Sequence, residues 1–144
     1  MSLTKPFLRF FAPLIVVIAS GCGGATERRI EPVFDAIAPQ ETVTLSGTEP
    51  FWSGVIEGGV LTWTTPEDLD GTRAELSRFA GNGGIGWSGE LGGERIDIAV
   101  GPGPCSDGMS DREYPFNAAV RLGDMSLTGC AYTDASPFSG PEIP

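Results

Sequence analysis

The side chains that could recognise a partner or a ligand are concentrated in two short segments. The first is GTEPFW at residues 47–52, which combines the carboxylate of Glu49 with the adjacent rings of Phe51 and Trp52. Neighbouring residues of a strand point to opposite faces, so one ring is expected in the core and the other at the surface. The segment therefore predicts either an aromatic platform beside Glu49 or a strand whose tryptophan covers one end of a barrel.

The second segment, CSDGMSDREYPF at residues 105–116, is the densest in polar groups. Its candidate binding residues are Asp107, Asp111, Arg112 and Tyr114. Carboxylate and hydroxyl oxygens could act as ligands for Ca²⁺. However, the spacing of these residues is not that of an EF-hand loop, and no glutamate lies where that loop needs a bidentate ligand. Short polar side chains in turns more often bond to their own backbone. We therefore predict a self-bonded turn without a metal, in which Asp111 pairs with an arginine.

The composition argues against catalysis. The chain has no histidine, which removes histidine-dependent hydrolase mechanisms and histidine-ligated zinc sites. A hydroxyl nucleophile would need a carboxylate as its base, and a barrel of this size has little room for a deep cleft beside its core. We expect no enzymatic activity and no cofactor.

The first residues are typical of an export signal. Lys5 and Arg9 precede a nine-residue apolar run at residues 10–18, which is too short to span a bilayer. The run ends in ASGC, which resembles the cleavage box of bacterial lipoproteins. The resemblance implies a signal peptide at residues 1–21 and a diacylglycerol on Cys22, and Gly23 after it favours the outer membrane. The alternative is an ordinary signal peptide followed by an unmodified cysteine.

Removal of this signal would make the chain strongly acidic. The remaining chain would contain seven arginines and all nineteen acidic residues, which gives a formal charge of −12. Such a chain repels nucleic acids and attracts cations or cationic proteins, although the charge could also serve solubility alone. We predict no nucleic-acid partner and regard a cationic protein as the candidate partner.

Length and composition predict one all-β domain. The chain has 144 residues, of which 21 are glycine and 12 are proline, and short apolar runs alternate with turn signals. We expect strands at residues 43–46, 51–57, 60–65, 72–79, 85–91, 94–100, 116–122 and 125–132. About eight short antiparallel strands favour a small barrel or sandwich at residues 43–132. Residues 22–42 are predicted as a tether, in which one or two amphipathic turns could rest on the domain, and residues 133–144 as a flexible tail.

Two cysteines remain for the domain itself. Cys105 and Cys130 form an even pair, and in an oxidising compartment such a pair predicts a disulfide that ties the polar loop to the last strand. A thiolate metal site is the alternative, but two cysteines without histidine are too few ligands for structural zinc.

Together, GTEPFW, CSDGMSDREYPF and the later Gly-Cys-Ala resemble a family of small bacterial envelope lipoproteins. The module also occurs beside domains of the c-type lysozyme inhibitor class, whose own cysteine and tyrosine pattern is absent here. The resemblance implies an envelope location on the periplasmic side and does not supply an activity. We therefore predict a binding or protective module, with lysozyme as the leading cationic partner. The alternatives are a small-molecule or metal carrier whose barrel mouth is lined by Trp52, Trp63 and Trp87, and a purely structural protein.

Overall fold

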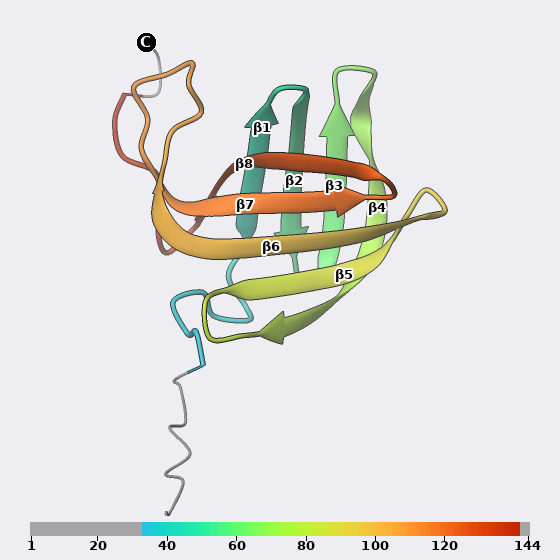
Figure 1. The fold of residues 1–144 in the computed structure, drawn as a ribbon, viewed down its shortest axis with the longest axis horizontal. Helices are drawn as coiled ribbons and strands as arrows, with labels where there is room; N and C mark the ends of the chain where they lie inside the picture. Colours follow the sequence, from blue (N-terminus) through green and yellow to red (C-terminus); the bar gives the residue numbers. More distant parts are fainter. Residues whose placement is uncertain (1–32, 142–144) are drawn as a thin grey trace, which may run out of the picture. The chain divides into compact units, whose positions relative to one another are not determined.

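Eight strands follow one another along the chain, and each pairs antiparallel with its sequence neighbour. They are β1 (Val43–Thr48), β2 (Phe51–Glu57), β3 (Val60–Thr65), β4 (Asp68–Ala80), β5 (Ile85–Leu91), β6 (Glu94–Cys105), β7 (Tyr114–Leu122) and β8 (Met125–Thr133). The last strand, β8, also pairs with β1, which closes the barrel. Figure 1 shows β5–β8 crossing in front of β1–β4. The predicted all-β fold is confirmed, and it is a closed barrel.

This computed structural model describes residues 33–141 of the chain. The predicted signal peptide at residues 1–21 and the predicted lipid site at Cys22 lie outside the described residues. Within residues 33–141, no helix has the length and apolarity needed to cross a membrane.

Two of the connections between consecutive strands are pairs of glycines. Gly58 and Gly59 have φ angles of 56° and 83°, and Gly92 and Gly93 have φ angles of 60° and 88°. Two-residue turns with positive φ match the twist of the strands on either side, and only glycine adopts them without a steric penalty. The local sequence therefore specifies the β2–β3 and β5–β6 connections.

Five strands are longer than predicted, and two of them, β4 and β6, are longer by five residues each. β4 begins at Asp68, four residues before the predicted start, and Asp68 pairs with Thr65 of β3. Its carboxylate accepts hydrogen bonds from Gly71 N at 3.0 Å and Thr72 Oγ1 at 2.9 Å. β6 continues through two prolines to Cys105, and the pairing register shifts between Pro102 and Cys105. Proline is tolerated at such irregularities, where the ladder hydrogen bond is already missing.

The interior of the barrel is filled by alternating side chains from every strand. Its largest members are Trp52, Trp63 and Trp87, which are 3–5% exposed. The rings of Trp52 and Trp63 stack with their centroids 4.8 Å apart. The three tryptophans therefore belong to the packed core, which gives no support to the alternative of a barrel mouth lined by these rings.

Residues 33–42, which we call the strap, lie against the end of the barrel next to the β4–β5 turn. Ile37 is 1% exposed and Phe34 packs against the core. Phe34 N donates to Gly81 O at 2.8 Å, and Arg78 Nη2 donates to Ile37 O at 2.7 Å. This part of the predicted tether therefore rests on the domain.

Residues 134–141, which we predicted as part of a flexible tail, also pack on the barrel. Phe138 contacts Tyr114 and Tyr132, with ring centroids 5.6 and 5.2 Å apart. The backbones of Glu113 and Ser139 exchange hydrogen bonds of 3.0 and 2.9 Å. These contacts hold the segment beside the loop that connects β6 and β7.

Candidate binding surface

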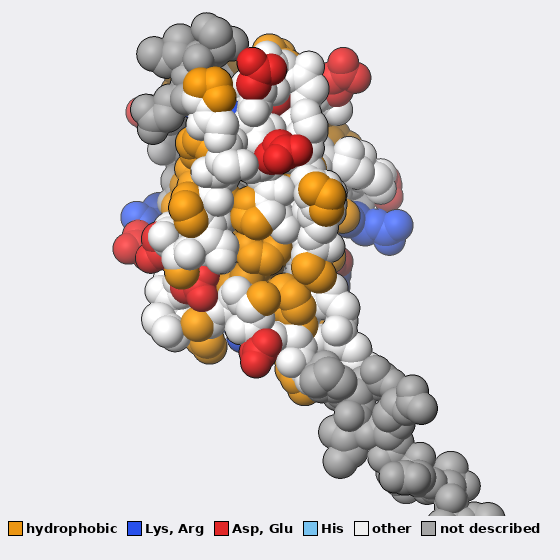
Figure 2. Space-filling view, turned by 90° about the vertical axis from the view of Figure 1, so that its left-hand side faces the viewer, with side chains coloured by type: hydrophobic (Ala, Val, Ile, Leu, Met, Phe, Trp, Pro, Cys, Tyr) orange, Lys and Arg blue, Asp and Glu red, His pale blue; other side chains and the backbone are white. Residues whose placement is uncertain are grey.

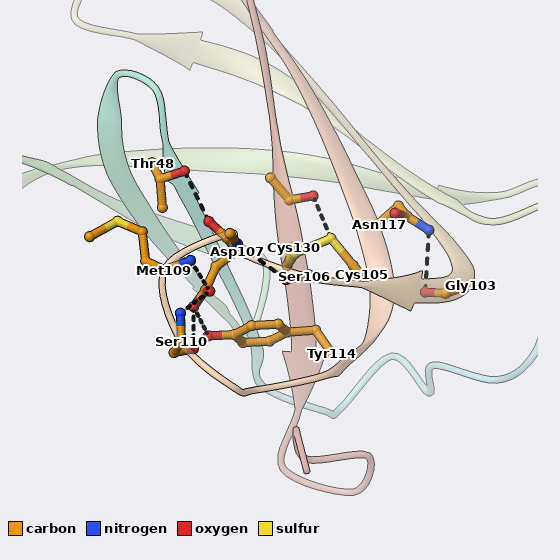
Figure 3. Close-up of a disulfide and its surroundings, with 12 residues drawn as sticks. Thr48, Gly103, Cys105, Ser106, Asp107, Met109, Ser110, Tyr114, Asn117 and Cys130 are labelled. Atoms are coloured by element: carbon orange, nitrogen blue, oxygen red, sulfur yellow. Dashed lines mark hydrogen bonds between the residues drawn. A yellow bond between two sulfur atoms is a disulfide. The ribbon is translucent and has the colours of Figure 1, made fainter. Parts of the chain in front are cut away.

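The two segments singled out in the sequence meet at one end of the barrel. Thr48, within the first segment, donates a hydrogen bond from Oγ1 to the carbonyl oxygen of Asp107 at 3.3 Å, across 59 positions of the sequence (Figure 3). A groove of about 500 Å³ lies here and is lined in part by Thr48, Phe51, Leu69 and Asp107. We call this groove and its rim the junction.

The disulfide fixes the second segment next to β8. Cys105 and Cys130 are bonded, with their Cα atoms 5.6 Å apart, which confirms the predicted pair. Cys130 lies between the inward-facing Gly129 and Ala131, so the bond sits on the outer side of the barrel wall. The loop at residues 106–113 therefore leaves the barrel from a covalently anchored point.

Asp107 organises this loop through both carboxylate oxygens (Figure 3). Its Oδ1 accepts hydrogen bonds from the backbone N–H groups of Met109 and Ser110, at 2.9 and 2.8 Å. Its Oδ2 accepts from the hydroxyls of Ser110 and Tyr114, at 2.8 and 3.0 Å. These hydrogen bonds, led by that of Met109, lower the pKa of Asp107 to about 2. The carboxylate is therefore ionised at neutral pH, and it holds the turn together as the sequence predicted.

Tyr114 and Arg112 support the loop from its far side. Tyr114 is buried, and that burial is the main cause of the raised pKa of its hydroxyl. The guanidinium carbon of Arg112 lies 4.5 Å from the ring centre of Phe138, and its Nε donates to Pro141 O at 3.4 Å. Both predicted site residues thus serve to fix the loop, and neither presents its polar group openly at the junction.

The GTEPFW segment divides its aromatic rings between core and surface. Trp52 is 4% exposed and covers the end of the barrel, whereas Phe51 is 53% exposed and faces the groove. Side chains at Gly47 and Gly129 would overlap Trp52 or the neighbouring backbone, so both glycines make room for the indole. The indole N–H is buried and has no hydrogen-bond partner in the described part of the chain. Glu49 is exposed in the turn between β1 and β2.

The junction combines apolar and acidic groups. Phe51, Leu69 and Met109 are 53%, 81% and 63% exposed, and Leu69 lines the same groove as Phe51. Leu69 and Met109 were not among the predicted site residues, although an apolar residue inside the polar stretch PEDLDG could have indicated Leu69. Hydrophobic side chains also gather in a band on the side of the molecule shown in Figure 2, with acidic side chains around it.

Acidic residues dominate the charge of the described domain. Residues 33–141 contain five arginines and sixteen acidic residues, and no lysine. Glu49 lies between the groove residues Thr48 and Phe51, and Asp111 is exposed in the adjacent loop. Across residues 33–141 there is no group of three acidic or cysteine side chains placed to hold a metal ion. The arrangement is thus suited to contact with a cationic, partly apolar surface.

The chain was also compared with known proteins. It matches no family model, no curated protein and no solved structure.

Proposed function

We propose that this chain is a lipid-anchored protein of the bacterial cell envelope, held on the periplasmic side, whose barrel binds a cationic protein at the junction. The predicted export signal, and the ASGC segment that resembles a lipoprotein cleavage box, support the location. The disulfide supports it as well, because such bonds persist in oxidising compartments such as the periplasm.

One observation carries the binding function: two segments far apart in the sequence converge on a single acidic surface with exposed apolar side chains. Phe51 and Leu69 can supply the buried contacts that dominate interface energy, and the surrounding carboxylates can steer a basic partner. The disulfide and the Asp107 hydrogen bonds hold the loop in one conformation, so little conformational entropy is lost on binding.

Lysozyme is the leading candidate partner because it is a basic enzyme that acts on the cell envelope. The exposed loop at residues 106–113 carries carboxylates on a rigid base and could enter a cleft of such an enzyme. Steering of this kind weakens as ionic strength rises.

The test is lysozyme activity in the presence of the purified protein at low and physiological salt. We expect inhibition in the tens of micromolar or below, and about tenfold weaker inhibition for Phe51→Ala, which removes the exposed ring. Glu49→Lys should slow association and reduce the dependence on salt. Glu57→Lys is the matched charge control, because Glu57 is exposed at the other end of β2 and should change inhibition by less than about twofold.

Absence of inhibition and of binding by lysozyme at low salt would remove this partner. Equal effects of Glu49→Lys and Glu57→Lys would show that only the overall charge matters and that the junction is not the site. A purely structural role predicts that no basic protein binds. The barrel interior gives no support to the alternative of a small-molecule or metal carrier, because the tryptophans proposed to line the barrel mouth are buried in the core.

A further inference from the structure

A second groove runs over the outer face of β5–β8 and is separate from the proposed protein-binding function. The register places Gly86, Ala99 and Ala119 in one row across β5, β6 and β7. Ala99 and Ala119 are exposed, and these small residues leave the sheet surface uncovered. Phe79 is 61% exposed and its ring lies against Gly86, so it forms a wall of this groove. We call this feature the outer groove.

The outer groove has the size of a ligand site. It consists of two adjoining hollows of about 570 and 640 Å³, which share Phe79, Ala99, Ala119 and Thr128. Pockets for small molecules fall in this range and are lined mainly by apolar groups with a few polar ones. Along β6 it extends from Gly101 to Asp97, four residues or about 13 Å at the rise of a strand. The small side chains of Ala99 and Ala119 lie side by side on β6 and β7, and so narrow a floor suits an extended alkyl chain along these strands better than a helix of about 10 Å diameter.

Positive charge is placed at one end of the outer groove. Arg95 forms two hydrogen bonds of 2.7 Å with Asp97, from Nε to Oδ2 and from Nη2 to Oδ1. Arg121 lies directly opposite Asp97 in the register, and all three residues line the hollow. Of the three charged residues that line this hollow two are arginines, so its lining carries a net charge of +1 on a strongly acidic domain. Glu90 lies opposite Arg95 in the register but does not line the groove.

We propose that the outer groove binds a free anionic amphiphile of the fatty-acid class, with its alkyl chain over Ala99 and Ala119 and its carboxylate at Arg121. The apolar floor provides burial for the chain, and the guanidinium provides a charge-assisted hydrogen bond for the head group. A site of this kind would let the protein take up or sense fatty acids without opening the filled barrel.

The experiment titrates the purified protein with decanoate below its critical micelle concentration and follows the methyl resonances of Ala99 and Ala119 by NMR. Both methyl groups should shift along a saturable curve. Decyltrimethylammonium, which has the same chain and a cationic head, should bind about tenfold more weakly or not at all. Ala119→Leu should block the floor, and Arg121→Glu should weaken decanoate binding about tenfold.

Arg73→Glu is the matched control for Arg121→Glu, because Arg73 is exposed on β4 and does not line the outer groove. It should change the affinity by less than about twofold. The altered side chains are exposed, so unchanged thermal midpoints will show that the variants remain folded.

Three results would overturn the proposal. They are decanoate shifts confined to other residues, equal binding of the anionic and cationic chains, and no binding of free decanoate while anionic vesicles bind. Dimerisation through this face, lost in Ala119→Leu without any decanoate effect, would assign the groove to a second copy instead. None of these results bears on lysozyme binding at the junction, so the two proposals can fail independently.

Discussion

Asp107 is the residue on which the β6–β7 loop depends. Its two oxygens accept four hydrogen bonds within the loop and from Tyr114. Asp107→Ala should lower the free energy of unfolding by about 2 kcal/mol, because it leaves these donors without their partner. Asp107→Asn keeps an acceptor for the two backbone N–H groups and should cost less, about 1 kcal/mol. Urea unfolding at neutral pH measures both values, and equal losses would contradict this account.

The low pKa of Asp107 links the same hydrogen bonds to pH. Its value of about 2 in the folded protein lies below the ordinary value of about 3.9. The folded state therefore binds fewer protons than the unfolded state, and the stability from Asp107 is fully present above about pH 5. This stability is lost as the pH falls towards 2. The difference in unfolding free energy between the natural protein and Asp107→Asn should shrink as the pH falls from about 5 towards 2. A constant difference over this range would contradict the prediction.

At the scale of elements, the strap completes one end of the barrel with a single buried side chain. Ile37 is 1% exposed, whereas Val33 in the same segment is 58% exposed. Ile37→Ala should lower the free energy of unfolding by about 2–4 kcal/mol, because it creates a cavity at a closed site. Val33→Ala should stay within about 0.5 kcal/mol and serves as the control. Similar small effects for both variants would show that the strap is not part of the cooperative fold.

At the scale of the whole molecule, the proposed export would determine which covalent bonds the chain carries. We expect mass spectrometry of the native product to find a chain that begins at a lipid-modified Cys22 and contains the Cys105–Cys130 disulfide. Replacing both Cys105 and Cys130 with alanine should cost about 3–4 kcal/mol, because the closed loop restricts the unfolded chain. A product that retains Met1 and three free thiols would remove the proposed location.

Much of this architecture could be predicted from the sequence because its signals are local. Glycine pairs specify turns through their own φ angles, and alternating apolar residues specify one buried face of a strand. The number of strands, the all-β fold and the disulfide followed from such signals. The lengths of β4 and β6 did not, because the pairing of Asp68 with Thr65 and a register shift near Pro102 override the polar and proline-rich composition.

The sequence by itself determined that one of Phe51 and Trp52 must be buried, because neighbours in a strand face opposite sides. Only the tertiary structure decided that Trp52 is buried, since Gly47 and Gly129 from two other strands leave the space that its ring fills. In the same way, the sequence identified Glu49 and Asp107 as candidate binding residues, but their placement at the same end of the barrel depends on barrel closure. Closure joins residues distant in the sequence, and no local pattern encodes which distant surfaces meet.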